Sequence, residues 1–169
     1  MSCALPRTNG PGATWFALSC LALWAGVAMS PAKAQDAPAA MANEFNDPFL
    51  QVTRAIAECP PEARPLVTPA EHREQAHWRA ERGTSCFRSG RCRLPNAYLY
   101  DAEIIPRVQK AILADGRFDD TSVWVEGQRR WVWLRGCVRD PAQSVALEQL
   151  VRSLDDVEAV INVLKPLAP

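Results

Sequence analysis

The sequence predicts a mixed α/β fold for its C-terminal half, an α/β two-layer sandwich with the order α-β-β-α-β and a three-stranded mixed sheet. Three patterns support this. Residues 101–116 have apolar side chains at helical spacing, residues 122–138 hold two alternating stretches around a turn, and a second helical stripe leads into the β-branched stretch 157–164. Because strand, helix and strand follow one another at the end, the last two strands should be parallel, with a right-handed crossover.

The first helix of this half is expected to run from Asp101, a suitable cap, to Gly116, whose tolerance of positive φ suits a helix end. Pro106 conflicts with a regular helix. Either the helix kinks there, or its regular part begins near Ile105. The apolar stripe of this helix consists of Ile104, Val108, Ala111 and Ile112.

The two alternating stretches predict a β-hairpin, turned by "GQR" at 127–129. Asp140 then caps a second helix that has Pro141 at its first position. The side chains expected to face the helices from the hairpin are Val123, Val125, Val132, Leu134 and Val138. The second helix should contribute Val145, Leu147, Leu150, Val151 and Leu154.

Residues 1–34 are expected to be a secretory signal peptide. The uncharged run "TWFALSCLALWAGVAM" precedes Ala32-Lys33-Ala34, a small-x-small pattern that predicts cleavage after Ala34. The run has about 16 residues, short of the ~20 of a spanning helix, which argues against a membrane anchor. Cys20 lies inside the run, which argues against a lipoprotein. Cleavage leaves 17 basic and 19 acidic residues, a net charge of −2, so neither a membrane span nor nucleic-acid binding is expected afterwards.

Between the signal and the α/β half, the sequence predicts a flexible lead-in at 35–43 and a helical, cysteine-containing extension at 44–98. A first helix is predicted from Asp47-Pro48, ending before the prolines of "CPPEARP". A second is predicted over 69–82, with Thr68 and Glu71 as its capping box, Gly83 as its exit and Trp78 as its contact with the core. Serine or threonine followed by glutamate three residues later is typical of a helix start, and glycine is typical of a helix end. Trp78 is the one large apolar side chain of this mostly charged helix.

Four cysteines remain after cleavage: Cys59, Cys86, Cys92 and Cys137. An even number in an exported chain indicates disulfides, and four cysteines allow three pairings. A zinc site usually needs closer pairs than the C-x5-C spacing found here. The working hypothesis joins Cys86 to Cys92 around the turn "FRSGR" and Cys59 to Cys137. A bond from Cys137 to Cys86 or Cys92 stays open.

The face of the hairpin that points away from the helices is unusually aromatic. Leaving this face exposed to water would be unfavourable, because each tryptophan side chain can bury ~150–250 Å² of surface. Either the extension folds over this face, with Cys137 bonded to it, or the face is an interfacial patch for anionic headgroups or a partner. Intermediate cases leave Trp124 or the Arg129-Arg130 turn uncovered. The residues of this possible lipid or partner face are Trp124, Arg129, Arg130, Trp131, Trp133 and Arg135.

The element order and the motifs "VWLRGCV" and "VEAVINVL" resemble the BON domain, a module of bacterial envelope proteins. The resemblance covers about 101–165 and places Gly136 at the family's characteristic glycine, within a domain expected at 99–167. A glycine there suggests a bend or a close backbone approach. Asp156 stands where the family usually has glycine before its last strand. Members often have two copies, whereas this sequence shows no internal repeat.

The resemblance implies a non-enzymatic periplasmic protein that associates with phospholipid or the envelope; an adaptor or accessory to an envelope secretion or assembly system is the alternative. The residues agree, because no nucleophile motif, phosphate loop or C-x-x-C pair is present. No cofactor or metal is expected. His72 and His77 lie five apart, so they are expected to be solvated and dispensable rather than metal ligands.

Overall fold

The computed structural model describes residues 39–167 of the 169-residue chain. The predicted signal peptide, 1–34, and the first part of the lead-in lie outside the described residues. The elements, in chain order, are β1 (Phe49–Gln51), α1 (Pro69–Arg88), the 3-10 helix η1 (Ala97–Tyr100), α2 (Asp101–Asp115), β2 (Ser122–Gln128), β3 (Trp131–Val138), α3 (Pro141–Arg152), β4 (Ala159–Asn162) and β5 (Lys165–Pro166).

The predicted mixed α/β fold is confirmed, but the sheet has five strands rather than three. Its order is β1-β2-β3-β4, and β5 also pairs with β3. The first three strands are antiparallel, whereas β4 and β5 run parallel to β3. The elements from α2 to β4 follow the order α-β-β-α-β. The extension adds β1 at the β2 edge, and the chain past β4 adds β5.

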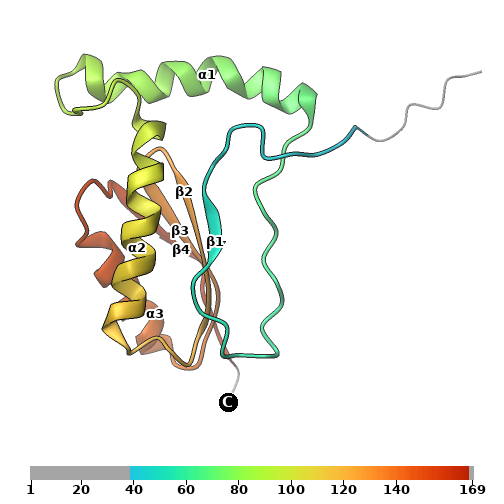
Figure 1. Cartoon of the computed structure of the whole chain (residues 1–169), viewed down its shortest axis with the longest axis vertical. Coiled ribbons are helices and arrows are strands. Elements are labelled where there is room, and N and C mark those ends of the chain that lie inside the picture. The colour runs from blue at the N-terminus through green and yellow to red at the C-terminus, as the bar shows by residue number, and fades with distance from the viewer. Residues whose placement is uncertain (1–38, 168–169) are drawn as a thin grey trace, which may run out of the picture. The chain divides into compact units, whose positions relative to one another are not determined.

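Helices α2 and α3 cover one face of the sheet, and the segment that follows β1 runs along the other side (Figure 1). The main core lies between the helices and the sheet, where the predicted inward-facing valines and leucine of the hairpin are fully buried. Val145 is an exception to the predicted stripe, because its side chain is 56% exposed. The fully buried core side chains include Tyr100, Ile104, Ile105, Val108, Ile112, Phe118, Leu134, Leu147 and Val151.

The predicted helix at 47–59 is wrong. This segment forms β1 and then continues extended, with the Val52 and Ala55 amides donating to the carbonyl oxygens of Val123 and Thr121. The segment is extended rather than helical because β2 would otherwise have an unpaired edge. Pairing gives hydrogen-bond partners to the backbone groups of both segments. The extension is therefore helical only in its second half.

Helix α1 begins as predicted but ends later. The capping box of Thr68 and Glu71 is present, and the helix continues through Gly83 to Arg88. Gly83 does not end the helix; it lies against the Asn96 side chain, where an added Cβ would overlap the amide. The buried contact is Arg79 rather than the predicted Trp78, which is only half-buried. No helix in the described residues is long and apolar enough to cross a membrane.

Two positions of positive φ explain features of the sequence. Gly136, in β3, has φ +107°, and a Cβ there would overlap the carbonyl oxygen of Ser122 and lie 2.9 Å from the Trp124 ring. Its role as a fold glycine follows from both the angle and the close approach. Asp156, which replaces the family's usual glycine, has φ +69°. Aspartate tolerates this region better than most side chains do.

Candidate functional site

The second face of the sheet is covered at one end by the extension. Trp124, 8% exposed, packs in a separate cluster with Ile56, Cys59 and Cys137. Ser122 fixes the covering segment, because its hydroxyl accepts from the Ile56 amide at 2.9 Å and donates to the Ile56 carbonyl at 3.1 Å. This end of the face therefore behaves as a second small core.

A disulfide joins this cover to β3. Cys59 bonds to Cys137, with the two Cα atoms 5.7 Å apart, and Cys86 bonds to Cys92. This is the hypothesised pairing, and the bond from Cys137 to Cys86 or Cys92 is excluded. The long bond spans 78 positions, so it holds the extension against the sheet across a large separation in sequence.

The other end of the face is less covered. Trp131 and Trp133 are half-buried, and their ring centroids lie 6.1 Å apart. The indole nitrogen of Trp131 is itself buried and has no hydrogen-bond partner among the described residues. The Arg129 guanidinium lies over the Trp131 ring, 4.8 Å from its centroid. These three side chains form what we call the hairpin aromatic edge.

Arg135 lies on the same face but is not a free cation, because it forms an ion pair. Its guanidinium pairs with the Glu126 carboxylate at 3.0 Å, and the Glu126 side chain is 8% exposed. Burial raises the pKa of Glu126, whereas the charge and hydrogen bond of Arg135 lower it. The pair keeps this carboxylate neutralised between Trp124 and Trp133 on the same face.

The hairpin turn consists of Arg129 and Arg130, one to two positions later than predicted. Both have positive φ, 59° and 67°, which is unusual for arginine and matches the tight two-residue turn that fits strand twist. The Asp101 carboxylate compensates by accepting both turn amides, at 2.6 and 2.8 Å. Asp101 is 1% exposed, and burial raises its pKa to about 7, although the turn amides lower it.

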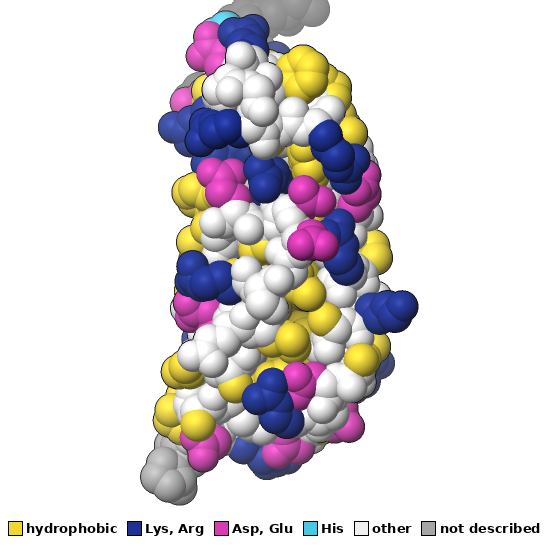
Figure 2. Space-filling view, turned by 90° about the vertical axis from the view of Figure 1, so that its left-hand side faces the viewer, with side chains coloured by type: hydrophobic (Ala, Val, Ile, Leu, Met, Phe, Trp, Pro, Cys, Tyr) yellow, Lys and Arg dark blue, Asp and Glu magenta, His cyan; other side chains and the backbone are white. Residues whose placement is uncertain are grey.

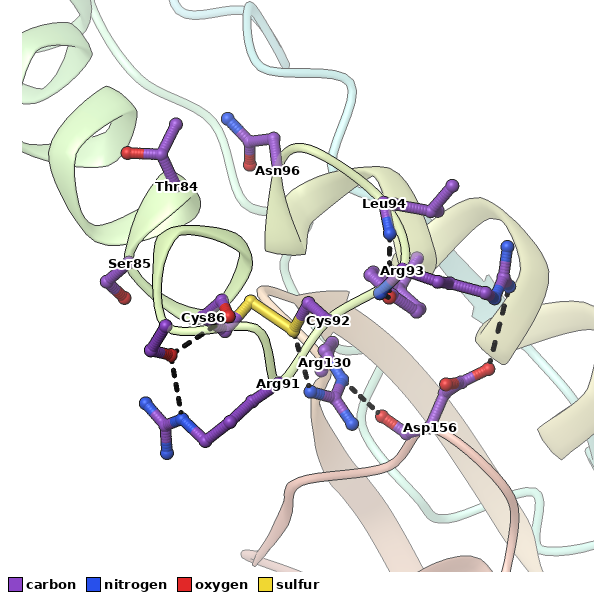
Figure 3. The surroundings of a disulfide bond; sticks show 12 residues. Thr84, Ser85, Cys86, Arg91, Cys92, Arg93, Leu94, Asn96, Arg130 and Asp156 are labelled. Carbon is purple, nitrogen blue, oxygen red and sulfur yellow. Dashed lines mark hydrogen bonds and ion pairs between the residues drawn. A yellow bond between two sulfur atoms is a disulfide. The ribbon is translucent and has the colours of Figure 1, made fainter.

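The side chain of Arg130 leaves the turn in a different direction from Arg129. It donates to the Asp156 carbonyl at 2.8 Å and to the Cys92 sulfur at 3.2 Å (Figure 3). It also lies over the Tyr100 ring. Arg130 thus connects the Cys86–Cys92 disulfide to the loop before β4.

A buried ion pair joins α1 to the chain before β1. Arg79 donates to both carboxylate oxygens of Asp47, at 3.0 and 2.5 Å, and both side chains are 7% exposed. The guanidinium is also held between the rings of Phe45 and Tyr98, 3.9 and 4.1 Å from their centroids. Gln128 donates to the same carboxylate, so the pair reaches the hairpin.

The structure divides the predicted lipid or partner face. It brings Arg129, Trp131 and Trp133 together, buries Trp124, and pairs Arg135. Sequence reasoning missed Asp101 as the acceptor of the turn amides and Arg79 as the buried contact of α1. Both roles depend on contacts between segments that are distant in the sequence, Asp101 with the 129–130 turn and Arg79 with Asp47, and no local pattern indicates them. The two histidines lie apart on α1: His77 is exposed beside Glu81, and His72 contacts Phe45.

No group of candidate metal ligands occurs among the described residues.

The comparison with protein families agrees with the fold. No curated protein matches the chain. The BON domain family matches residues 100–166, which are the segment from the end of η1 to β5. The positive φ of Gly136 and the paired hairpin lie inside this match. Residues 100–166 of this chain are therefore a BON domain.

Proposed function

We propose that this protein is exported to the periplasm by removal of residues 1–34 and that it associates there with anionic phospholipid of the envelope, without catalysing a reaction. BON domains suggest an envelope association, and two disulfides fit an oxidising compartment. In this proposal the exported chain has a lead-in at 35–43, an extension at 44–98 and the BON domain at 99–167.

The hairpin aromatic edge is the observation that supports lipid binding best. The extension covers Trp124 but leaves Trp131 and Trp133 half-buried beside Arg129. Tryptophan favours the membrane interface, where its ring is apolar and its N–H can reach water or a headgroup. Each arginine adds about 1 kcal/mol near an anionic surface.

Vesicle flotation tests this proposal. The chain from residue 35 should float with phosphatidylglycerol vesicles at low salt, not with phosphatidylcholine vesicles, and binding should weaken as salt rises. Trp131→Gln combined with Trp133→Gln should reduce the floating fraction severalfold. Phe87→Gln is the matched control, because it removes an aromatic ring that is 47% exposed at the end of α1. Melting temperatures check that each variant is folded.

Two results would contradict the proposal. Wild-type protein that stays with the vesicle-free fraction at low salt would leave an envelope protein as the partner of this edge. Equal flotation of the tryptophan double variant, the Phe87 variant and the wild type would show that lipid binds elsewhere on the protein.

A further inference from the structure

A surface cavity of about 200 Å³ lies where the extension meets the BON domain. Its walls come from the end of α1, the start of η1, the β2–β3 turn and the chain just before β4. The lining residues are Arg82, Ser85, Cys86, Arg91, Ala97, Arg129, Arg130 and Glu158. The volume is several times the ~30 Å³ that a water molecule occupies in the liquid, so the cavity has room for a small polar group.

The cavity has a strong excess of positive charge. Four arginine residues line it, against a single acidic residue, Glu158. Within residues 39–167, none of these four arginines forms an ion pair with a carboxylate. The arginines that do are Arg79, Arg93, Arg107, Arg117, Arg135, Arg139 and Arg152, all outside the lining. On the face over α2 and α3, basic and acidic side chains are interspersed along the whole length (Figure 2), so the excess of arginine is local to the cavity.

Neutral partners hold the four guanidinium groups in place. Arg82 lies over Trp78 at 4.7 Å, and Arg129 and Arg130 lie over Trp131 and Tyr100. The remaining arginine, Arg91, donates to the Ser89 hydroxyl at 2.9 Å. Stacking orients a guanidinium without neutralising it, so the edge N–H groups of Arg82 and Arg129 can still reach an anion. Arg130 has fewer donors left, because its Nε and one Nη already donate to the Asp156 carbonyl and the Cys92 sulfur. Side chains ordered in advance lose less entropy when a ligand binds.

The backbone around the cavity is also fixed. The Cys86–Cys92 disulfide closes the loop between α1 and η1 and forms part of the wall. The two turn amides bound by Asp101 fix the arginines on the opposite wall. The backbone around the cavity is therefore held by a covalent bond and a buried carboxylate, whereas the side chains of Arg82, Arg91 and Glu158 are exposed.

We propose that this cavity is a binding site for a phosphate group. Several guanidinium groups around one cavity suit phosphate, because their paired N–H donors match its oxygens and charge assistance strengthens each bond. The negative charge of Glu158 repels phosphate and therefore lowers the affinity of the cavity for it. The phosphate can belong to a soluble phosphorylated compound or to a phospholipid headgroup. Only the second case rests on the proposed function.

Calorimetric titration of the chain from residue 35 with inorganic phosphate and with glycerol 3-phosphate tests the site. Arg82→Gln combined with Arg91→Gln should weaken binding about tenfold or more, because charge-assisted hydrogen bonds are lost. Glu158→Gln should strengthen it severalfold. Arg64→Gln combined with Arg73→Gln is the matched control, because these exposed arginines also form no ion pair among the described residues, and it should change nothing.

The same variants in vesicle flotation identify the source of the phosphate. Loss of both glycerol phosphate binding and phosphatidylglycerol flotation in the Arg82, Arg91 variant assigns the cavity to a lipid headgroup. Loss of glycerol phosphate binding alone assigns it to a soluble compound, and the site then stands even if no wild-type protein floats. Wild type without measurable binding of either soluble probe, and with flotation unchanged in the variant, would overturn the proposal.

Discussion

The hairpin requires glycine at position 136, because no side chain fits there. Gly136→Val places a branched side chain at φ +107° and against the Ser122 carbonyl. We expect the free energy of unfolding to fall by about 3 kcal/mol or more, and the melting temperature by roughly 10 °C. Gly90→Val is the control. Its φ is also positive, +72°, but nothing lies within 4 Å of an added Cβ. Equal losses in both variants would contradict the close approach.

Asp101 gives the stability of the fold a distinctive pH dependence. Its folded pKa, about 7, is above the value of 3.8 for a free aspartate, so the folded state favours the protonated carboxyl. The resulting stabilisation is complete below about pH 4 and is lost as the pH rises through about 7. We expect wild type to lose stability over this window relative to Asp101→Asn, whose amide does not titrate. Urea unfolding at several pH values measures this, and parallel curves for the two proteins would contradict it.

At the scale of elements, the Asp47–Arg79 pair fixes α1 to the chain before β1. Arg79→Met should lower the free energy of unfolding by roughly 3–5 kcal/mol, because it leaves the Asp47 carboxylate buried without its cation. Adding Asp47→Asn should recover part of the loss. The control, His77→Ala, changes an exposed side chain on the same helix and should unfold like wild type. Denaturant titration distinguishes these outcomes. An Arg79→Met variant as stable as the His77→Ala control would contradict the role of the pair.

The elements also show what the sequence could predict. Helices α2 and α3 and the hairpin follow from local periodicity, capping and glycine signals within 101–152. Strand β1 could not be predicted in the same way, because Asp47-Pro48 satisfies the rules for a helix start and only pairing with a distant strand overrides them. The short loop between Cys86 and Cys92 suggested one disulfide, but the partner of Cys137 stayed open until the structure showed Cys59. The ion pairs and the arginine cavity depend on contacts between distant segments, which a single sequence does not show.

At the scale of the whole molecule, the two disulfides should differ in their effect. In the chain-entropy account, the bond across 78 positions constrains the unfolded state by about 4–5 kcal/mol, and the bond across six by about 2. Cys59→Ser with Cys137→Ser should therefore melt at a lower temperature than Cys86→Ser with Cys92→Ser. It should also release the extension to protease before the BON domain is cut. Cleavage of the domain first, or equal melting of both variants, would contradict the covering role.

The central claim is that the extension covers Trp124 and leaves the hairpin aromatic edge for lipid. Tryptophan fluorescence in brominated phosphatidylglycerol vesicles tests it most directly, in a Trp78→Phe background that leaves Trp124, Trp131 and Trp133 after signal removal. We predict strong quenching on vesicle binding, which disappears when Trp131 and Trp133 are also changed to phenylalanine because Trp124 stays under its cover. Bound protein without quenching, or quenching that persists with Trp124 alone, would contradict the claim.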